Sequence, residues 1–206
     1  MTGLLIALAL VAAYLLGAIP SAYIVGRLRK GTDIRQVGSR NMGAMNVFYS
    51  VGFGWGALVL AMDIGKGAAA MAIALALGIP EVARFAAGIV AVLGHGFPVF
   101  LRFQGGRGGA TCIGVLSVAM PWGIPVFTGI FGLALLITRF PTLSYSLGLL
   151  SFPFVGWLRY DWQLAVFSVV LLLVPVIRYL PRIREMRAVA GNWGHVLRRR
   201  GLSDRF

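Results

Sequence analysis

The chain alternates between long apolar runs and short polar stretches that are rich in glycine, asparagine and arginine. Apolar runs occupy residues 3–26, 54–79, 85–101, 110–138, 143–158 and 162–180. A membrane-spanning helix needs about 20 mostly apolar residues, so these runs are long enough, or nearly long enough, to cross a bilayer. The pattern predicts an all-α, polytopic integral membrane protein.

The run 110–138 is long for one helix, and two prolines interrupt its middle. It forms either one kinked helix or two short helices joined near Trp122. The positive-inside rule favours two, because only Arg84 and Arg159 among the basic residues between runs then face the outside. This arrangement gives about seven transmembrane helices, with the N-terminus outside and the C-terminus in the cytoplasm.

Composition supports the membrane class. The 206 residues are 59% hydrophobic and only 12% charged, and the mean hydropathy is +0.86. The net charge of +13 comes from basic residues between the apolar runs and in the tail, so we expect lipid head groups and phosphate-bearing substrates as partners, and no nucleic acid. One domain, 1–206, is expected, with a basic cytoplasmic tail from about residue 182. A monomer is consistent with the sequence, which does not define the oligomeric state.

The topology places three polar stretches on the cytoplasmic side: residues 37–50, 63–67 and 94–111. Glycine clusters expose backbone N–H groups, and an arginine among them can hold a phosphate through paired hydrogen bonds. With two histidines, six acidic residues and one cysteine in the chain, no metal site and no cofactor are expected.

Each stretch has a functional and a structural interpretation. The first could surround an anion with donors or be an ordinary polar turn; its candidate residues are Gly38, Ser39, Arg40, Asn41, Gly43 and Asn46. Asp63 and Lys66, three apart, could form a structural ion pair or belong to the site.

The third stretch has the same ambiguity. His95 could be a packed structural histidine or a hydrogen-bond donor or base. Arg107 could anchor the topology or bind phosphate, and the candidates around it are Gly105, Gly106, Gly108 and Thr111.

These stretches resemble the three motifs of the bacterial acyl-phosphate-dependent glycerol-3-phosphate acyltransferases, the PlsY family. The first motif is matched at Gly38, Ser39, Asn41, Gly43 and Asn46, the second at Asp63, Lys66 and Gly67, and the third at Gly94, His95, Pro98, Phe100, Gly105, Gly106, Gly108, Ala110 and Thr111, with Arg107 in place of lysine. The matches keep the family's order and spacing and cover nearly the whole chain.

The resemblance implies transfer of a fatty acyl group from acyl phosphate to glycerol 3-phosphate, giving lysophosphatidate and phosphate at the cytoplasmic face of the inner membrane. It implies catalytic roles for Ser39, Asn41, Lys66, His95 and Arg107. The residues expected to bind substrate are Gly38, Arg40, Gly43, Asn46, Asp63, Gly67, Gly105, Gly106, Gly108 and Thr111. No metal or other cofactor is implied.

The chain departs from the family pattern where the acceptor is held. Arg40 replaces a glycine, Tyr49 replaces an arginine, and Tyr179 and Arg182 stand where the family has histidine and asparagine. We expect Arg40 to take over the role of the missing arginine. Two alternatives remain open: a membrane transporter or channel for a phosphorylated metabolite, and a non-catalytic relative that binds lipid.

Overall fold

The computed structural model describes residues 1–191, and within this range every regular element is a helix. The all-α prediction is therefore confirmed for the described residues, whereas His195 and the last part of the basic tail lie outside them. The helices are α1 (Thr2–Ala18), α2 (Ser21–Lys30), η1 (Ile34–Gln36), α3 (Ala44–Ser50), α4 (Phe53–Ala76), α5 (Glu81–Gly96), η2 (Val99–Leu101), α6 (Gly109–Ala119), α7 (Gly123–Thr138), α8 (Pro141–Leu149), α9 (Ser151–Arg159) and α10 (Trp162–Ala190).

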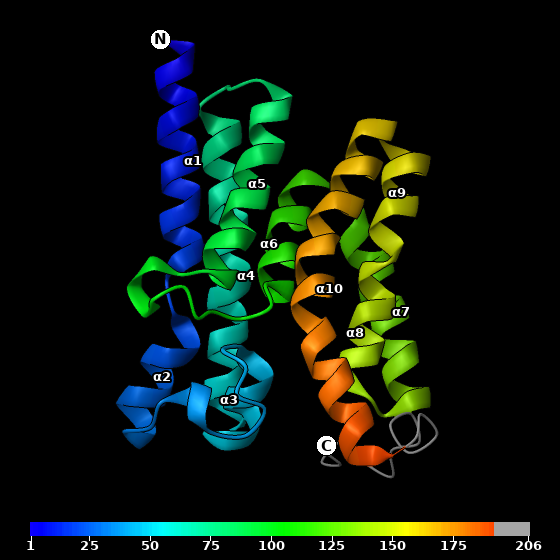
Figure 1. The fold of residues 1–206 in the computed structure, drawn as a ribbon. Coiled ribbons are helices and arrows are strands. Elements are labelled where there is room, and N and C mark those ends of the chain that lie inside the picture. The colour runs from blue at the N-terminus through cyan, green and yellow to red at the C-terminus, as the bar shows by residue number, and fades with distance from the viewer. Residues whose placement is uncertain (192–206) are drawn as a thin grey trace.

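The long helices lie side by side along one axis, with α1, α4 and α5 on one side, α7 to α9 on the other, and α6 and α10 between them (Figure 1). The short helices α2 and α3 gather at one end of the molecule, and α10 finishes at that same end. By length and composition, the helical stretches able to cross a membrane are Thr2–Lys30, Phe53–Ala76, Glu81–Leu101 and Trp162–Ala188; Gly109–Ala119 and Gly123–Thr138 are apolar but shorter.

Several predicted runs are divided in the structure. The run 3–26 breaks between α1 and α2 at Pro20, which has no N–H to continue the helix. The run 110–138 forms α6 and α7, separated by a turn at residues 120–122, so the two-helix alternative is confirmed. The run 143–158 corresponds to α8 and α9.

Two elements differ from the sequence pattern. Helix α10 continues beyond residue 180 to Ala190, so the start of the predicted tail is part of this helix, despite Pro175 and Pro181. Helix α3 lies inside the stretch predicted as a polar loop. Its seven residues were too few to give a helical hydrophobic pattern.

Glycines let the helices that carry the polar motifs approach closely. A Cβ on Gly67 of α4 would collide with the carbonyl oxygen of Thr111 in α6, and one on Gly114 would collide with that of Ile64. Gly94 of α5 meets the carbonyl of Tyr14 in α1 in the same way. Such small-residue contacts are typical of membrane helix packing. They bring the middle of α4 to the beginning of α6, and the end of α5 to the end of α1.

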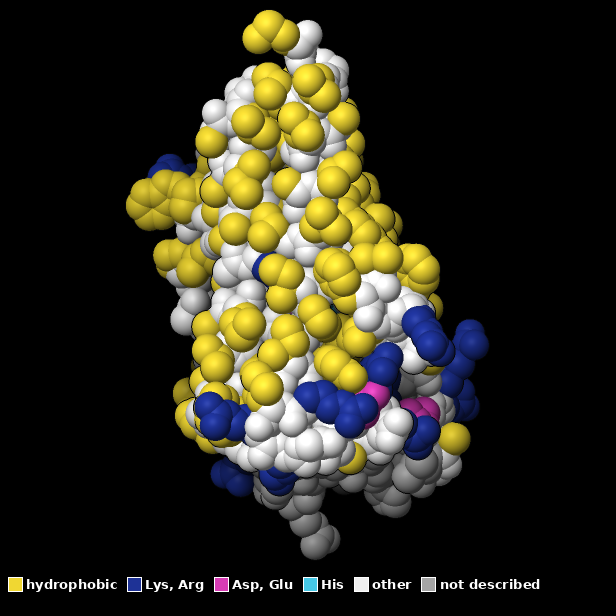
Figure 2. All heavy atoms as spheres, turned by 90° about the vertical axis from the view of Figure 1, so that its left-hand side faces the viewer, with side chains coloured by type: hydrophobic (Ala, Val, Ile, Leu, Met, Phe, Trp, Pro, Cys, Tyr) yellow, Lys and Arg dark blue, Asp and Glu magenta, His cyan; other side chains and the backbone are white. Residues whose placement is uncertain are grey.

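The surface separates into an apolar band and a basic end. Figure 2 shows hydrophobic side chains over most of the face formed by α1, while most Lys and Arg side chains on this face gather toward the end that carries α2. Large apolar side chains are exposed along the helices, for example Leu4, Leu133 and Leu158. This distribution fits a protein whose sides face lipid tails and whose basic end lies at the head groups.

Candidate active site

A buried charged cluster lies where α4 and α5 meet. Lys66 and Asp63, one turn apart on α4, form an ion pair with 2.8 Å between Nζ and Oδ1. His95, near the end of α5, places Nδ1 3.6 Å from the same carboxylate oxygen. Lys66 also donates to the carbonyl of Ile19 at 2.9 Å, where α1 ends. The ion pair proposed from the sequence is present, and it belongs to a larger polar group that links three helices.

The glycine segment 105–108 runs directly over this cluster. Gly105 donates its N–H to the carbonyl of Gly96, and Gly106 donates to that of His95, both at 3.1 Å. A Cβ on Gly106 would collide with His95 Nε2 and with the carbonyl oxygen of Met42. Only glycine therefore allows this backbone to lie against the imidazole.

Arg178 of α10 holds the glycine segment from the other side. Its guanidinium donates to the carbonyl of Gly105 at 3.0 Å and to that of Gly106 at 3.2 Å. It also lies over the ring of Phe97, with 4.6 Å between Cζ and the ring centroid. Sequence analysis assigned Arg178 no such contact. The available signal was an arginine inside an apolar helix, which is costly unless it has a specific partner.

A cationic pocket of about 210 Å³ opens beside the glycine segment. It is lined by Ser39, Arg40, Asn41, Arg107, Arg178, Pro181, Arg182 and Glu185. The Arg107 guanidinium lies 4.5 Å from the ring centroid of Tyr179, which fixes its direction. Four arginines against one carboxylate make the pocket strongly positive, and their planar groups suit phosphate oxygens.

Glu185 is the pocket's carboxylate and it pairs with two of the arginines. Its Oε2 lies 2.7 Å from Arg182 Nη1, and its Oε1 lies 3.8 Å from Arg40 Nη2. The Arg40 side chain is 74% exposed. The loop before α3 and the end of α10 are thus bridged across the pocket by a carboxylate.

Asn46 holds the first polar stretch in shape. Its side-chain NH2 donates to the carbonyls of Ile34, Val37 and Asn41, and its oxygen accepts from the Ser39 N–H at 3.1 Å. The residue is only 2% exposed. From the first turn of α3, Asn46 bonds to the preceding segment, residues 34–41, and this segment presents Ser39, Arg40 and Asn41 to the pocket.

The remaining candidates shape the surroundings. Gly67 and Thr111 meet at the α4–α6 crossing. Gly108 adopts a φ of +91° at the start of α6, a conformation that favours glycine. Thr111 is fully buried, and its hydroxyl oxygen has no hydrogen-bond partner. Over residues 1–191, no group of three His, Cys, Asp or Glu side chains is placed to hold a metal ion.

A family model described as glycerol-3-phosphate acyltransferase matches residues 7–189. The chain belongs to this family. Among curated relatives, glycerol-3-phosphate acyltransferase 2 of Dehalococcoides mccartyi strain 195 is 48% identical over an alignment of 206 positions that covers 98% of each chain. The glycerol-3-phosphate acyltransferase of Bacillus subtilis strain 168 is 37% identical over 183 residues, covering 89% of this chain and 94% of the relative.

Two crystal structures of PlsY (YgiH), an integral membrane glycerol 3-phosphate acyltransferase, share the fold. The glycerol 3-phosphate form superposes with a TM-score of 0.82 at 31% identity, covering 90% of this chain and 92% of that one. The lysophosphatidic acid form gives 0.79 at 30% identity, with the same coverage. The family resemblance inferred from the three motifs is confirmed.

For this acyltransferase-family chain, the structure sorts the predicted site residues into layers. Ser39, Arg40, Asn41 and Arg107 line the cationic pocket. Below them are the glycine segment and then the buried cluster of Asp63, Lys66 and His95. Of the other candidates, Gly38 and Gly43 lie in the loop before α3, Asn46 lies in the first turn of α3, and Gly67 and Thr111 lie in the α4–α6 contact.

Proposed function

We propose that this protein transfers a fatty acyl group from acyl phosphate to the 1-hydroxyl of glycerol 3-phosphate. The products are lysophosphatidate and phosphate, and the reaction is the first acylation of phospholipid synthesis. The observation that carries the proposal is a pocket lined by four arginines, set against a glycine segment above a buried Asp63–Lys66–His95 cluster, in a chain of this family.

The proposal includes a placement in the membrane. The chain forms one membrane-embedded domain whose seven spans are α1, α4, α5, α6, α7, α8 with α9, and α10; in Figure 1 these segments run alternately down and up. The N-terminus is outside, and the pocket faces the cytoplasm at the inner membrane. Support comes from the basic residues near the pocket end, which the positive-inside rule assigns to the cytoplasm. We propose a monomer that needs no cofactor.

The chemistry suits a pocket that positions charges. Acyl phosphate is a mixed anhydride, so attack by the hydroxyl forms the ester C–O bond and breaks the bond between the acyl carbon and the phosphate oxygen. The departing phosphate accepts the hydroxyl proton. Arg107 and the N–H groups at the start of α6 stabilise the negative charge that develops on the donor, which lowers the barrier without a protein nucleophile.

The two layers of the site have different roles in this proposal. Ser39, Asn41 and Arg107 line the pocket and contact the substrates. His95 and Lys66 lie beneath the glycine segment and act as positioning residues, because His95 packs on Gly106 and Lys66 neutralises the carboxylate that faces His95. Loss of Ser39 or Asn41 should therefore raise KM mainly. Loss of Arg107, which stabilises the developing charge, or of a buried residue should lower kcat mainly.

Arg40 supplies the acceptor contact that Tyr49 cannot. Arg40 lines the pocket, whereas Tyr49 is not among its lining residues. The Arg40 backbone has a φ of +54°, which glycine adopts without strain. Arg40→Gly should raise the KM for glycerol 3-phosphate roughly tenfold, the effect of losing one charged hydrogen bond, and leave the KM for acyl phosphate unchanged. An unchanged acceptor KM would contradict this role.

The function is tested with purified protein, palmitoyl phosphate and glycerol 3-phosphate, measuring phosphate and lysophosphatidate together. Equal amounts of both products support the proposal, and Lys66→Ala, His95→Ala and Arg107→Ala should abolish or greatly reduce them. Arg139→Gln, a charge loss directly after α7, serves as the matched control. Phosphate without lysophosphatidate would refute glycerol 3-phosphate as the acceptor, and flux into proteoliposomes without either product would indicate a transporter.

A further inference from the structure

A second cavity lies between α7 and α9. Its volume is about 460 Å³, within the range of roughly 300–1,000 Å³ that is typical of ligand pockets. It is lined by Trp122, Val126, Ile130, Ser151, Phe154, Val155, Leu158 and Arg159. It shares no lining residue with the cationic pocket.

The mouth of this α7–α9 groove is remote from the glycine segment. Helix α6 begins at Gly109, next to that segment, and ends at Ala119, just before Trp122. At 1.5 Å per residue, this helix separates the two by about 16 Å. The groove therefore does not belong to the site described above.

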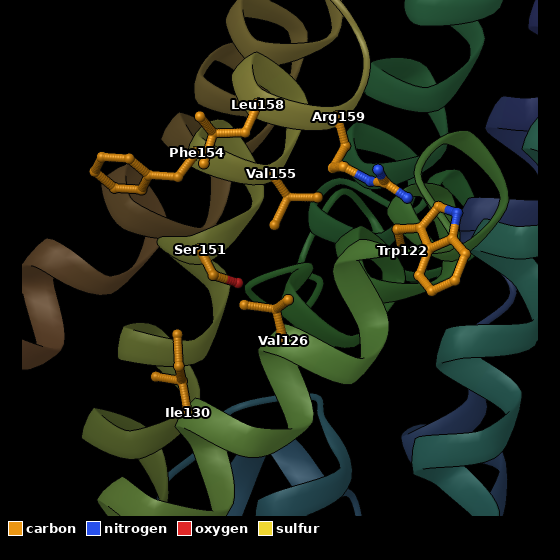
Figure 3. A pocket seen from close by; sticks show the side chains of 8 residues that line it. All are labelled: Trp122, Val126, Ile130, Ser151, Phe154, Val155, Leu158 and Arg159. Atoms are coloured by element: carbon orange, nitrogen blue, oxygen red, sulfur yellow. The ribbon is translucent and has the colours of Figure 1, made fainter.

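The walls of the groove are hydrocarbon. The hydroxyl of Ser151 faces the cavity in Figure 3 but already donates to the carbonyl of Gly148 at 2.7 Å. Apart from Arg159 at one end, the other lining residues are aliphatic or aromatic. Phe154 and Leu158 form the rim and are 70% and 76% exposed. An apolar groove open on the side of a membrane protein excludes a polar ligand and favours an acyl chain.

One end of the groove carries a cation at the level of an aromatic anchor. Figure 3 shows Arg159 reaching from the end of α9 toward Trp122, and its Cζ lies 5.4 Å from the indole centroid. Trp122 also donates its backbone N–H to the hydroxyl of Tyr160 at 3.2 Å. Asp161, two residues after Arg159, uses its carboxylate to accept the Leu164 N–H at 2.8 Å and so caps α10. Tryptophan and tyrosine mark the head-group level of a bilayer.

We propose that the α7–α9 groove binds an anionic phospholipid from the leaflet opposite the active site. One acyl chain lies along Val126, Ile130 and Val155, and the lipid phosphate pairs with Arg159. The guanidinium offers several N–H donors in a plane that matches phosphate oxygens, and Trp122 fixes its position. The positive charge at the mouth matches the lipid phosphate, and the apolar walls match the acyl chain. The site goes beyond acyl transfer and does not depend on it.

The test uses delipidated full-length protein in detergent, titrated with phosphatidylglycerol and analysed by native mass spectrometry. Wild type should bind one phosphatidylglycerol with higher affinity than phosphatidylcholine. Arg159→Gln should weaken phosphatidylglycerol binding roughly tenfold, the effect of one charged hydrogen bond. Arg139→Gln, which removes the same charge at the other end of α7, should bind as wild type does.

A second variant tests the groove independently of its charge. Val126→Trp fills the cavity from α7 while Arg159 stays in place, so it should also lose the bound lipid. Both variants should keep acyl transfer from palmitoyl phosphate, which shows that they are folded. Equal affinities of Arg159→Gln and Arg139→Gln for phosphatidylglycerol would overturn the proposal. It would also be overturned if wild type formed a dimer through this groove, so that Val126→Trp abolished the dimer and left lipid binding unchanged.

Discussion

At the scale of single residues, the site combines arginines that attract anions with one carboxylate that forms ion pairs with two of them. Glu185 pairs with Arg182 and lies 3.8 Å from Arg40. A phosphate that enters the pocket must compete with this carboxylate for the same guanidinium groups. The pocket is consequently less attractive to anions than its four arginines alone would make it.

Replacing Glu185 by glutamine should strengthen acceptor binding. The variant keeps the shape of the side chain and removes its charge, so KM for glycerol 3-phosphate should fall roughly two- to fivefold, as expected for a partly exposed ion pair of about 0.5–1 kcal/mol. Steady-state kinetics at fixed palmitoyl phosphate measures this change. A raised KM would mean that Glu185 organises the arginines instead of competing for them.

Asp33 is a second residue whose charge matters, in the turn that follows α2. Hydrogen bonds from the Arg35 side chain hold the pKa of the Asp33 carboxyl below its usual value of 3.8, and Arg35 also contacts the side-chain oxygen of Gln104 at 3.3 Å. Because the folded pKa is lowered, the charged form stabilises the fold above the unfolded pKa, and this contribution is lost as pH falls through the folded value.

Asp33→Asn should therefore destabilise the protein in a pH-dependent way. At pH 7 we expect a loss of about 1.5–3 kcal/mol, the range for a hydrogen bond to a charged group. The difference from wild type should shrink as the pH falls from about 5, where the unfolded carboxyl begins to protonate, and should vanish below the folded pKa, which lies under 3.8. Thermal unfolding in detergent across this range measures the effect, and a difference that stays constant with pH would contradict the assignment. Arg35→Gln should show the same narrowing.

At the scale of elements, the crossing of α4 and α6 positions the site. At Gly67 and Gly114 the two helices approach backbone to backbone, which holds the start of α6, directly after the glycine segment, against the middle of α4. On the same helix, a Cβ on Gly65 would meet nothing within 4 Å. The sequence alone does not distinguish these glycines, but Gly67 and Gly114 are required for the helix contact, whereas Gly65 is not.

Alanine substitutions should separate these glycines. Gly114→Ala should lower stability by about 1–3 kcal/mol, because its Cβ would meet the backbone of α4 and force the helices apart. Gly65→Ala should be neutral or stabilising by up to about 1 kcal/mol, because it adds helix propensity in open space. Denaturation in detergent compares the two, and equal effects would show that the crossing tolerates a wider spacing.

Sequence reasoning identified the motif residues at this scale but not their arrangement in layers. Periodicity and length gave the apolar runs, and three motifs gave the family, because glycine, lysine and histidine at fixed spacing are specific. The pattern could not show that Asn46 bonds its own loop or that Arg178 reaches the glycine segment 72 residues earlier. The first depends on how residues 34–41 fold back onto Asn46, and the second on a contact between distant segments. No periodic pattern encodes either.

At the scale of the whole molecule, the two cavities lie toward opposite ends of the helix bundle. The cationic pocket lies at the end that carries α2 and α3, and the groove mouth lies where α6 ends and α7 begins. In the proposed orientation the first meets anionic substrates from the cytoplasm, and the second meets lipid head groups of the opposite leaflet. The membrane orientation of the bundle therefore decides which compartment serves each cavity.

Cysteine labelling tests this orientation directly. Lys30 lies at the end of α2, near the pocket, and Val82 lies in the first turn of α5 at the other end and is 76% exposed. A membrane-impermeant maleimide applied to intact cells should label Val82→Cys and leave Lys30→Cys unlabelled, with the reverse in inside-out vesicles. The native Cys112 is fully buried, so the unsubstituted protein should give no background. Labelling of Lys30→Cys in intact cells would show that the bundle has the opposite orientation in the membrane. The pocket would then face a compartment that lacks cytoplasmic acyl phosphate.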